Sequence, residues 1–459
     1  MEPVKGGKPS EAGENLKKKE NSTEENNSSR KEETPNEWWT SLNEAWKKIF
    51  KNAINITEEP NETELQLIFD LEQLYLYADY ELMPLVKDLT PLRKLHKLTS
   101  LSTSSGRVKS INAISHLNSL TNLDLNSNPI ENIDILKSFK DLETLSLSGT
   151  AVKNINVIKG MKSLRSLALG NTKVKDLSPI LSLPQLESLD IGNMRIRDID
   201  FIKGLKELTT LYCSQTWITD LNTVATLEKL EALYIGNSRI RNVEALAQLA
   251  TMKNLDISYT RVEDISSLRT LLNLESLNFN STSIESIDCC SAMSGLLSLY
   301  CSNTFIENLE PLRGNKVINS IDISETFVKD LSPLSECTEL KYLVFNRTDI
   351  NSMKSLIDIS GIESITCSDT DVENIDALKA KTELRSLDLR NTNVKNISAL
   401  SNSTQLSYLN ISNTSVSDLS PIDEMSELST IYCSNCPISD KELERFKEKH
   451  PNCNVDLNY

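Results

Sequence analysis

The 459-residue chain is poor in aromatic residues and in positive charge. Aromatic side chains make up 5% of it, which favours many copies of a thin aliphatic core over a few large ones. Its formal charge of -16 disfavours a nucleic-acid partner, because binding a phosphate backbone needs a basic stripe. No apolar run approaches the roughly 18 residues that cross a membrane, and no secretory signal is found. We therefore expect no membrane insertion and a cytoplasmic location.

Residues that commonly carry catalysis are also scarce. The three histidines, His96, His116 and His450, are not spaced as metal ligands, and the 13 glycines form no phosphate-binding loop. Cys433 and Cys436 form a single C-x-x-C, which is weak evidence for a zinc or redox site. The sequence predicts no enzyme, no catalytic residue, no metal site and no cofactor.

Both ends of the chain differ from its middle. Residues 1–33 are mostly Lys, Glu, Asn and Ser, which predicts a disordered polar tail. Residues 34–70 predict an N-terminal helical cap that opens with a capping box at Thr34 and Glu37. Residues 439–459 predict a C-terminal cap that opens in the same way at Ser439 and Glu442. The apolar face of the first helix is expected to comprise Trp39, Leu42, Trp46, Ile49, Phe50 and Ala53.

Between these caps, a first irregular strand is expected at Leu74-Tyr75-Leu76, and one pattern then repeats every 22 residues from Leu98 onward. The pattern is L-x-x-L-x-L-x-x-T-x-V-x-x-L, and we call its second leucine the marker of each repeat. The markers are Leu101, Leu123, Leu145, Leu167, Leu189, Leu211, Leu233, Leu255, Leu277, Leu299, Ile321, Leu343, Ile365, Leu387, Leu409 and Ile431.

The spacing within one repeat predicts its local structure. Alternating apolar residues around the marker predict a short strand with one inward face. Later apolar residues, as at Val174, Leu177 and Ile180, recur every third residue and suit 3₁₀ or short helical turns. We expect an α/β solenoid over residues 71–438, with a curved parallel β-sheet on the concave side, turns on the convex side and helical caps.

This pattern resembles the 22-residue class of leucine-rich repeats found in internalins and in a nuclear regulator of a Ser/Thr phosphatase. The resemblance covers about five sixths of the chain, and Thr in place of the common Asn is closest in style to uncharacterised bacterial repeat proteins. It implies an arc whose concave face binds protein ligands. No binding residue is transferred, because such sites vary among proteins of one fold.

Several repeated polar residues are better explained by structure than by chemistry. Cys213, Cys301, Cys367 and Cys433 occupy inward apolar positions, so they are expected to be buried and reduced. Thr recurs five residues after most markers and is expected to bond to its own turn. Asp recurs one residue after every third marker, at Asp124, Asp190, Asp256, Asp322 and Asp388. Neighbours in that set are predicted to lie about 14 Å apart, too far for the roughly 5–9.5 Å of a glycosidase pair.

Two sets of residues are candidates for binding a protein partner. Tyr212, Tyr234 and Tyr300 lie on the concave strand face among small residues; they are either binding anchors or simply good strand formers. Arg195, Trp217 and Arg239 belong to a basic stripe just after the strands, which is either a site for an acidic partner or solvated charge.

The sequence therefore predicts a non-enzymatic protein-binding scaffold or adaptor that uses the concave face of an arc. Two alternatives remain open at this point. The first is a regulatory subunit that positions a phosphatase or other enzyme, and the second is a host-interacting bacterial effector or surface protein.

Overall fold

The computed structural model describes residues 33–76 and 85–457. All but the last residue of the predicted tail, 1–33, lies outside this part. The chain forms two compact units, Met1–Leu42 and Asn43–Tyr459. Each is described separately.

The described part of the first unit contains one short helix, α1 (Pro35–Thr40). The predicted capping box is confirmed: the Thr34 Oγ1 accepts a hydrogen bond from the Glu37 N–H at 3.2 Å, and the Glu37 carboxylate accepts the Thr34 N–H at 2.8 Å. The expectation of one continuous helix through this segment is wrong. The Ser41 hydroxyl donates to the Trp38 carbonyl at 2.6 Å and α1 ends, because such local side-chain bonds compete with the helical ladder.

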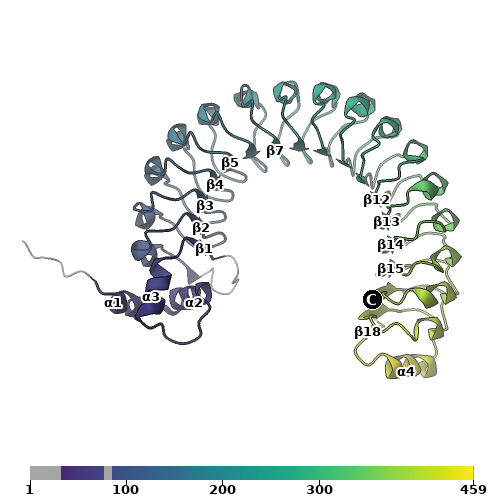
Figure 1. Ribbon diagram of the computed structural model, residues 1–459. Coiled ribbons are helices and arrows are strands. Elements are labelled where there is room, and N and C mark those ends of the chain that lie inside the picture. The colour runs from purple at the N-terminus through teal and green to yellow at the C-terminus, as the bar shows by residue number, and fades with distance from the viewer. Residues whose placement is uncertain (1–32, 77–84, 458–459) are drawn as a thin grey trace, which may run out of the picture. The chain divides into compact units, whose positions relative to one another are not determined.

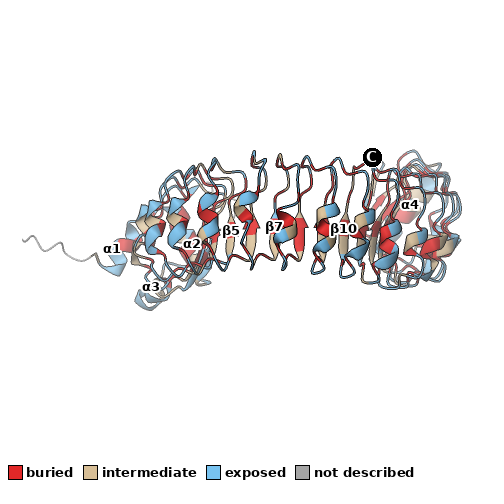
Figure 2. Ribbon diagram, turned by 90° about the horizontal axis from the view of Figure 1, so that it is seen from above, coloured by how far each residue is buried: buried red, intermediate tan, exposed pale blue. Residues whose placement is uncertain are grey.

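The second unit begins with two helices, α2 (Glu44–Ala53) and α3 (Glu62–Phe69), at the N-terminal end of the repeats (Figures 1 and 2). Asn43 starts α2 by accepting the Trp46 N–H at 3.0 Å. Trp46 and Phe50 are buried, with their ring centroids 5.3 Å apart, and Ile49 is buried beside them on α2. Ala53 is exposed, so its predicted place on the apolar face is wrong.

The repeats of this unit form one parallel sheet, in which every strand pairs with the next one along the chain. Strands β2 to β17 are centred on the sixteen predicted markers, which confirms the register. The strands are β1 (Gln73–Tyr75), β2 (Ser100–Ser102), β3 (Asn122–Asp124), β4 (Thr144–Ser146), β5 (Ser166–Ala168), β6 (Ser188–Asp190), β7 (Thr210–Tyr212), β8 (Ala232–Tyr234), β9 (Asn254–Asp256), β10 (Ser276–Asn278), β11 (Ser298–Tyr300), β12 (Ser320–Asp322), β13 (Tyr342–Val344), β14 (Ser364–Thr366), β15 (Ser386–Asp388), β16 (Tyr408–Asn410), β17 (Thr430–Tyr432) and β18 (Asn454–Asp456).

Short 3₁₀ turns alternate with the strands and lie on the outer side of the curve that the repeats describe, with the strands on the inner side (Figure 1). Their apolar residues step by three, as predicted from the spacing. The turns are η2 (Thr90–Lys94), η3 (Asn112–Ile114), η4 (Asp134–Ser138), η5 (Asn156–Gly160), η6 (Ser178–Ser182), η7 (Asp200–Ile202), η8 (Val224–Thr226), η9 (Glu244–Gln248), η10 (Ser266–Thr270), η11 (Asp288–Ala292), η12 (Glu310–Leu312), η13 (Ser332–Glu336), η14 (Lys354–Leu356), η15 (Asp376–Leu378), η16 (Ser398–Asn402) and η17 (Ser420–Ile422).

The chain leaves each strand through a tight turn. The fourth residue after every marker has a positive φ, between 51° at Arg347 and 71° at Gly149. From Ser105 to Asn413 its N–H donates to the carbonyl of the third residue after the next marker; for Ser127 and Ser148 the distance is 2.8 Å. The left-handed residue thus turns the chain out of the sheet and links one repeat to the next.

A column of threonines, each five residues after a marker, forms hydrogen bonds within this turn. In ten repeats the Thr hydroxyl donates to the carbonyl three residues earlier, at 2.6–2.8 Å, which confirms the predicted bond to its own turn. Asn128, in the same column, behaves differently. Its amide donates to the Thr103 carbonyl of the preceding repeat at 2.7 Å and its Oδ1 accepts the Val108 N–H at 3.0 Å, so it bridges two repeats.

The C-terminal segment contains a helix, α4 (Asp440–Lys449), and a strand that the repeat period did not predict. Ser439 accepts the Glu442 N–H at 3.2 Å, but the other half of the predicted capping box is missing, because the Glu442 carboxylate accepts the Leu419 N–H instead. Beyond α4, β18 pairs with β17 in the register Val455 to Ile431. The spacing is 24 residues rather than 22, since a longer α-helix replaces the 3₁₀ turn.

The threonine column makes a stability prediction with an internal control. Thr326→Val removes the 2.6 Å bond to the Ile323 carbonyl and should lower the free energy of unfolding by about 1 kcal/mol. The buried Thr172 hydroxyl has no partner within the described residues, so Thr172→Val should be neutral or stabilising. Urea unfolding followed by circular dichroism measures both, and an equal loss in the two variants would contradict the role of this bond.

All nine cysteines are free, and the four at inward strand positions are buried as predicted. Burial raises the pKa of the Cys433 thiol to about 12 and raises the pKa values of Cys213, Cys301 and Cys367 well above the ordinary value.

A raised pKa lowers the thiolate fraction at neutral pH, and the thiolate is the reactive species. In the native protein these four thiols should therefore resist alkylation, whereas the partly exposed Cys436 and Cys453 should react first. Mass spectrometry of the alkylated protein checks this order. Rapid native labelling of the inward four would contradict the burial of these positions.

Candidate functional site

The concave face brings two predicted tyrosines into direct contact. Tyr212 on β7 and Tyr234 on β8 are paired residues of neighbouring strands, and their rings stack with centroids 4.7 Å apart and planes 5° apart. Tyr212 is 41% exposed and Tyr234 is half-buried. Burial, followed by the neighbouring Tyr212, raises the pKa of Tyr234, so its hydroxyl stays protonated at neutral pH. Together the rings form one amphipathic platform on the sheet.

The third predicted tyrosine is separate from this pair. Tyr300 on β11 is half-buried and lies between Asn278 and Asp322 in the strand register. A second tyrosine pair occurs near the C-terminal end, where the rings of Tyr408 and Tyr432 lie 5.7 Å apart at an angle of 49°.

The five concave aspartates have a structural role. Each carboxylate accepts the backbone N–H two residues later at 2.8–3.0 Å; Asp190 accepts that of Gly192, and Asp322 that of Ser324. Asn278 and Asn410 make the same bond in their repeats. Of the five, Asp388 has a raised pKa, caused by burial. These bonds explain why Asp and Asn recur one residue after the marker.

Beside the tyrosine pair, small residues leave a hollow of about 440 Å³ at the edge of the sheet. Gly170, Gly192 and Ser148 line it, and Asp190 occupies its floor next to Tyr212 in the strand register. A Cβ on Gly170 would approach the Asp190 Oδ2 to 2.9 Å. The next repeat thus leaves no room for a larger side chain at Gly170, and small residues line the hollow.

The predicted basic stripe gathers around one indole. The guanidinium carbons of Arg195, Arg197 and Arg239 lie 5.7, 5.2 and 4.9 Å from the centre of the Trp217 ring. All three arginines are exposed, and none forms an ion pair within the described residues. Cation–π attraction holds the cluster together and leaves its positive charge unneutralised.

Sequence reasoning missed a second aromatic pair on the same edge. Phe305 and Phe327 stand at the position of Trp217 in later repeats, and their rings stack at 6.1 Å and 14°. They are 48% and 53% exposed. Their 22-residue separation was the available signal, since residues one period apart lie side by side.

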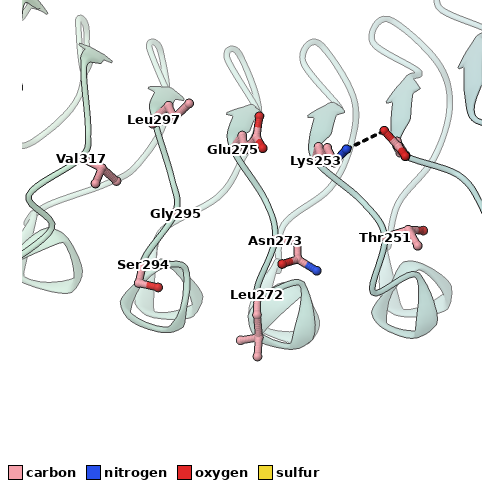
Figure 3. Close-up of a pocket in the computed structure, with 10 residues that line it drawn as sticks. Thr251, Lys253, Leu272, Asn273, Glu275, Ser294, Gly295, Leu297 and Val317 are labelled. Atoms are coloured by element: carbon pink, nitrogen blue, oxygen red, sulfur yellow. Dashed lines mark hydrogen bonds and ion pairs between the residues drawn. The ribbon is translucent and has the colours of Figure 1, made fainter.

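The opposite edge of the sheet carries a second hollow, of about 610 Å³ (Figure 3). Its apolar wall includes Leu272, Leu297 and Val317, which are all exposed. The Lys253 ammonium pairs with the Glu231 carboxylate at 2.8 Å at one end of it. The cation of this hollow is thus neutralised within the chain, unlike the arginines around Trp217.

The structure also places two histidines together. His96 and His116, which sequence spacing had kept apart, have ring centroids 5.1 Å apart. Burial and the neighbouring His96 lower the pKa of His116. In the described residues no group of three or more His, Cys, Asp or Glu side chains is arranged to hold a metal ion. No helix in the same residues is long and apolar enough to span a membrane.

These observations define the class of fold: the chain forms a leucine-rich-repeat solenoid, and it is similar in fold to bacterial leucine-rich-repeat proteins that include internalins. The family of leucine-rich repeats, in its two-copy form, matches residues 162–204. Proteins with this fold generally mediate protein–protein interactions and are typically non-enzymatic scaffolds. Comparison with curated proteins gave no match.

Several solved structures are similar in fold. A leucine-rich-repeat protein of Leptospira interrogans is 20% identical, with a TM-score of 0.62, over 88% of this chain and 100% of that one. The functional domain of InlJ from Listeria monocytogenes, which includes a cysteine ladder, is 20% identical over 74% of each chain with a TM-score of 0.59. The GASSHO1/SCHENGEN3 receptor-kinase ectodomain of Arabidopsis thaliana, solved in complex with Casparian strip integrity factor 2, is 17% identical over 80% of this chain and 48% of that one, with a TM-score of 0.57.

The structural role of the concave aspartates can be tested by stability. Asp322→Asn keeps an acceptor for the Ser324 N–H, as Asn278 does naturally, and should unfold at nearly the same urea concentration as the parent protein. Asp322→Ala leaves that N–H without its side-chain acceptor and should lose about 1–2 kcal/mol. Equal stability of both variants would show that this hydrogen bond does not contribute.

Proposed function

We propose that the chain is a protein-binding scaffold or adaptor whose partner contacts the concave face at the stacked pair Tyr212–Tyr234. The observation that carries this proposal is the parallel stack itself, a rigid aromatic platform with one exposed ring. Tyrosine supplies a large amphipathic contact area at a small entropic cost. A pair already ordered by stacking loses still less freedom when a partner binds.

The surroundings of the pair support an extended segment as the bound element. Neighbouring concave positions hold Thr210, Ala232 and Asn254, which let a chain approach the sheet. The hollow beside Asp190 offers backbone and side-chain oxygens to donors on such a segment. An apolar side chain would lie on the tyrosines while polar groups fill the hollow.

The plant receptor ectodomain's complex with Casparian strip integrity factor 2 supports a macromolecular ligand for this fold, not this particular site. We propose a cytoplasmic setting, which the buried free thiols suit, since reduced cysteines are usual there. The two alternatives differ in what the site would hold. A regulatory subunit would retain a phosphatase or another enzyme, and an effector or surface protein would retain a host protein.

A partner can be identified through the platform itself. A photoreactive phenylalanine derivative placed at Tyr212 should cross-link the bound protein upon irradiation, and the same derivative at the exposed Ile357 on the outer turns should not. Mass spectrometry of the cross-linked product then identifies both the partner and the segment in contact.

Affinity for that partner tests the pair. Tyr212→Ala combined with Tyr234→Ala should raise the dissociation constant roughly 30-fold or more, because a central aromatic anchor typically contributes about 2 kcal/mol. The matched control is Tyr408→Ala with Tyr432→Ala, which removes the other concave pair and should leave the affinity unchanged. Unchanged binding by the first double variant would make the concave platform the wrong site.

A further inference from the structure

The edge of the sheet just beyond the strands is divided by charge. We define the edge column as the residue six positions after each marker from Leu167 to Ile365: Lys173, Arg195, Trp217, Arg239, Arg261, Ser283, Phe305, Phe327, Asp349 and Asp371. Its first half is basic around Trp217, and its second half is aromatic and then acidic. In the outer edge column, eight positions after the marker, Lys175, Arg197 and Arg241 are followed by Glu263, Glu285 and Glu307 and then by Lys329.

Most of these charges have no counter-ion in their own chain. Within the described residues, no ion pair or side-chain hydrogen bond involves Arg195, Arg197 or Arg241, nor Glu285 or Glu307 on the acidic half. Elsewhere on the protein, neighbouring repeats do match their charges, as in the pairs Lys253–Glu231 and Lys341–Glu363. The edge therefore holds unmatched cations on one half and unmatched carboxylates at Glu285 and Glu307 on the other, whereas Asp349 is paired with Lys329 of its own chain at 3.0 Å.

We propose that this edge binds the same edge of a second copy of the chain, which forms a two-fold symmetric dimer. A two-fold contact requires a self-complementary surface, in which residue i meets residue j and j meets i. We place the two-fold axis along the radius of the curve, between Arg261 and Ser283. Rotation about this axis brings the edge of the second copy against the edge of the first, with the repeats in reverse order. Residues at the same radius then face one another, so edge column meets edge column.

This axis pairs unlike residues along most of the edge. Arg239 faces Phe305 of the second copy, Trp217 faces Phe327, and Arg195 faces Asp349. In the outer column, Arg241 faces Glu307. The contacts are therefore a cation on an aromatic ring, an aromatic pair and the ion pair Arg241–Glu307, and each of them occurs twice by symmetry. Arg195 meets an Asp349 that is already paired with Lys329 of its own chain.

Contacts close to the axis set the strength of the dimer. Tyr259 is 65% exposed and follows the strand in the repeat of Arg261, where it would be covered. Glu263 and Glu285 face each other and oppose association. Because the outer contacts are ionic, we expect dissociation to increase with salt concentration. The concave tyrosine pair is not part of this edge, so partner binding there and dimerisation are separate properties.

The first test uses the full chain in sedimentation velocity over a range of concentrations. The parent protein should sediment as a reversible dimer. Phe305→Ser with Phe327→Ser should raise the dimer dissociation constant at least about 30-fold, because each aromatic anchor is lost twice. The control, Leu272→Ser with Leu297→Ser, removes exposed apolar side chains from the opposite edge and should leave the dimer unchanged.

A charge-reversal pair tests the register and the symmetry together. Arg241→Glu alone places Glu opposite Glu307, and Glu307→Arg alone places Arg opposite Arg241, so each variant by itself should be monomeric. Mixing the two restores opposite charges at both symmetric contacts and should restore a dimer containing one chain of each kind. Arg269→Asp, on the outer turn η10, is the matched charge control and should remain dimeric.

Each outcome decides the proposal. A parent protein that stays monomeric at all concentrations would overturn it, as would single variants that dimerise like the parent or a mixture that fails to recover the dimer. Circular dichroism of each variant verifies that the repeats remain folded. Loss of the dimer with intact partner affinity, or the converse, distinguishes this interface from the concave site.

Discussion

One tight turn sets the geometry of every repeat. In each repeat from β2 to β17, the fourth residue after the marker takes a left-handed conformation, and from Ser105 to Asn413 its N–H donates to a carbonyl of the next repeat. This bond keeps successive turns at the spacing of parallel strands, about 4.8 Å. At that spacing residue types recur in straight columns, so a side chain meets its equivalent one period away. The tyrosine stack, the phenylalanine stack and the arginines around Trp217 all depend on this alignment.

The sequence predicted the repeats well because a strict period leaves little freedom. Sixteen markers fixed the strands, and the inward cysteines and the threonine column followed from the same register. The ends were harder to predict. The break between α1 and α2 depends on local hydrogen bonds of Ser41 and Asn43. A helical pattern of apolar residues does not reveal such bonds. Strand β18 was missed because the helix before it changes the spacing to 24 residues.

The candidate surfaces show a similar division. Tyr212 and Tyr234 could be named from the sequence because adjacent repeats place them side by side. Their parallel stack and the burial of Tyr234 required coordinates. From the sequence, the recurring aspartates were expected to be too far apart for an acid/base pair, but their bond to the backbone N–H two residues later emerged only from the turn geometry. Residue type alone does not separate a binding column from a turn-forming one.

The threonine column has a mechanical consequence. Because ten of its hydroxyls bond within their own repeat, these bonds survive when a neighbouring repeat detaches. Stability in such arrays is a sum of repeat terms and nearest-neighbour terms. Tension along the array would therefore detach the repeats one after another, each at a similar force. Asn128 joins two repeats through its side chain, so detaching these repeats, near the N-terminal end of the array, would require a larger force.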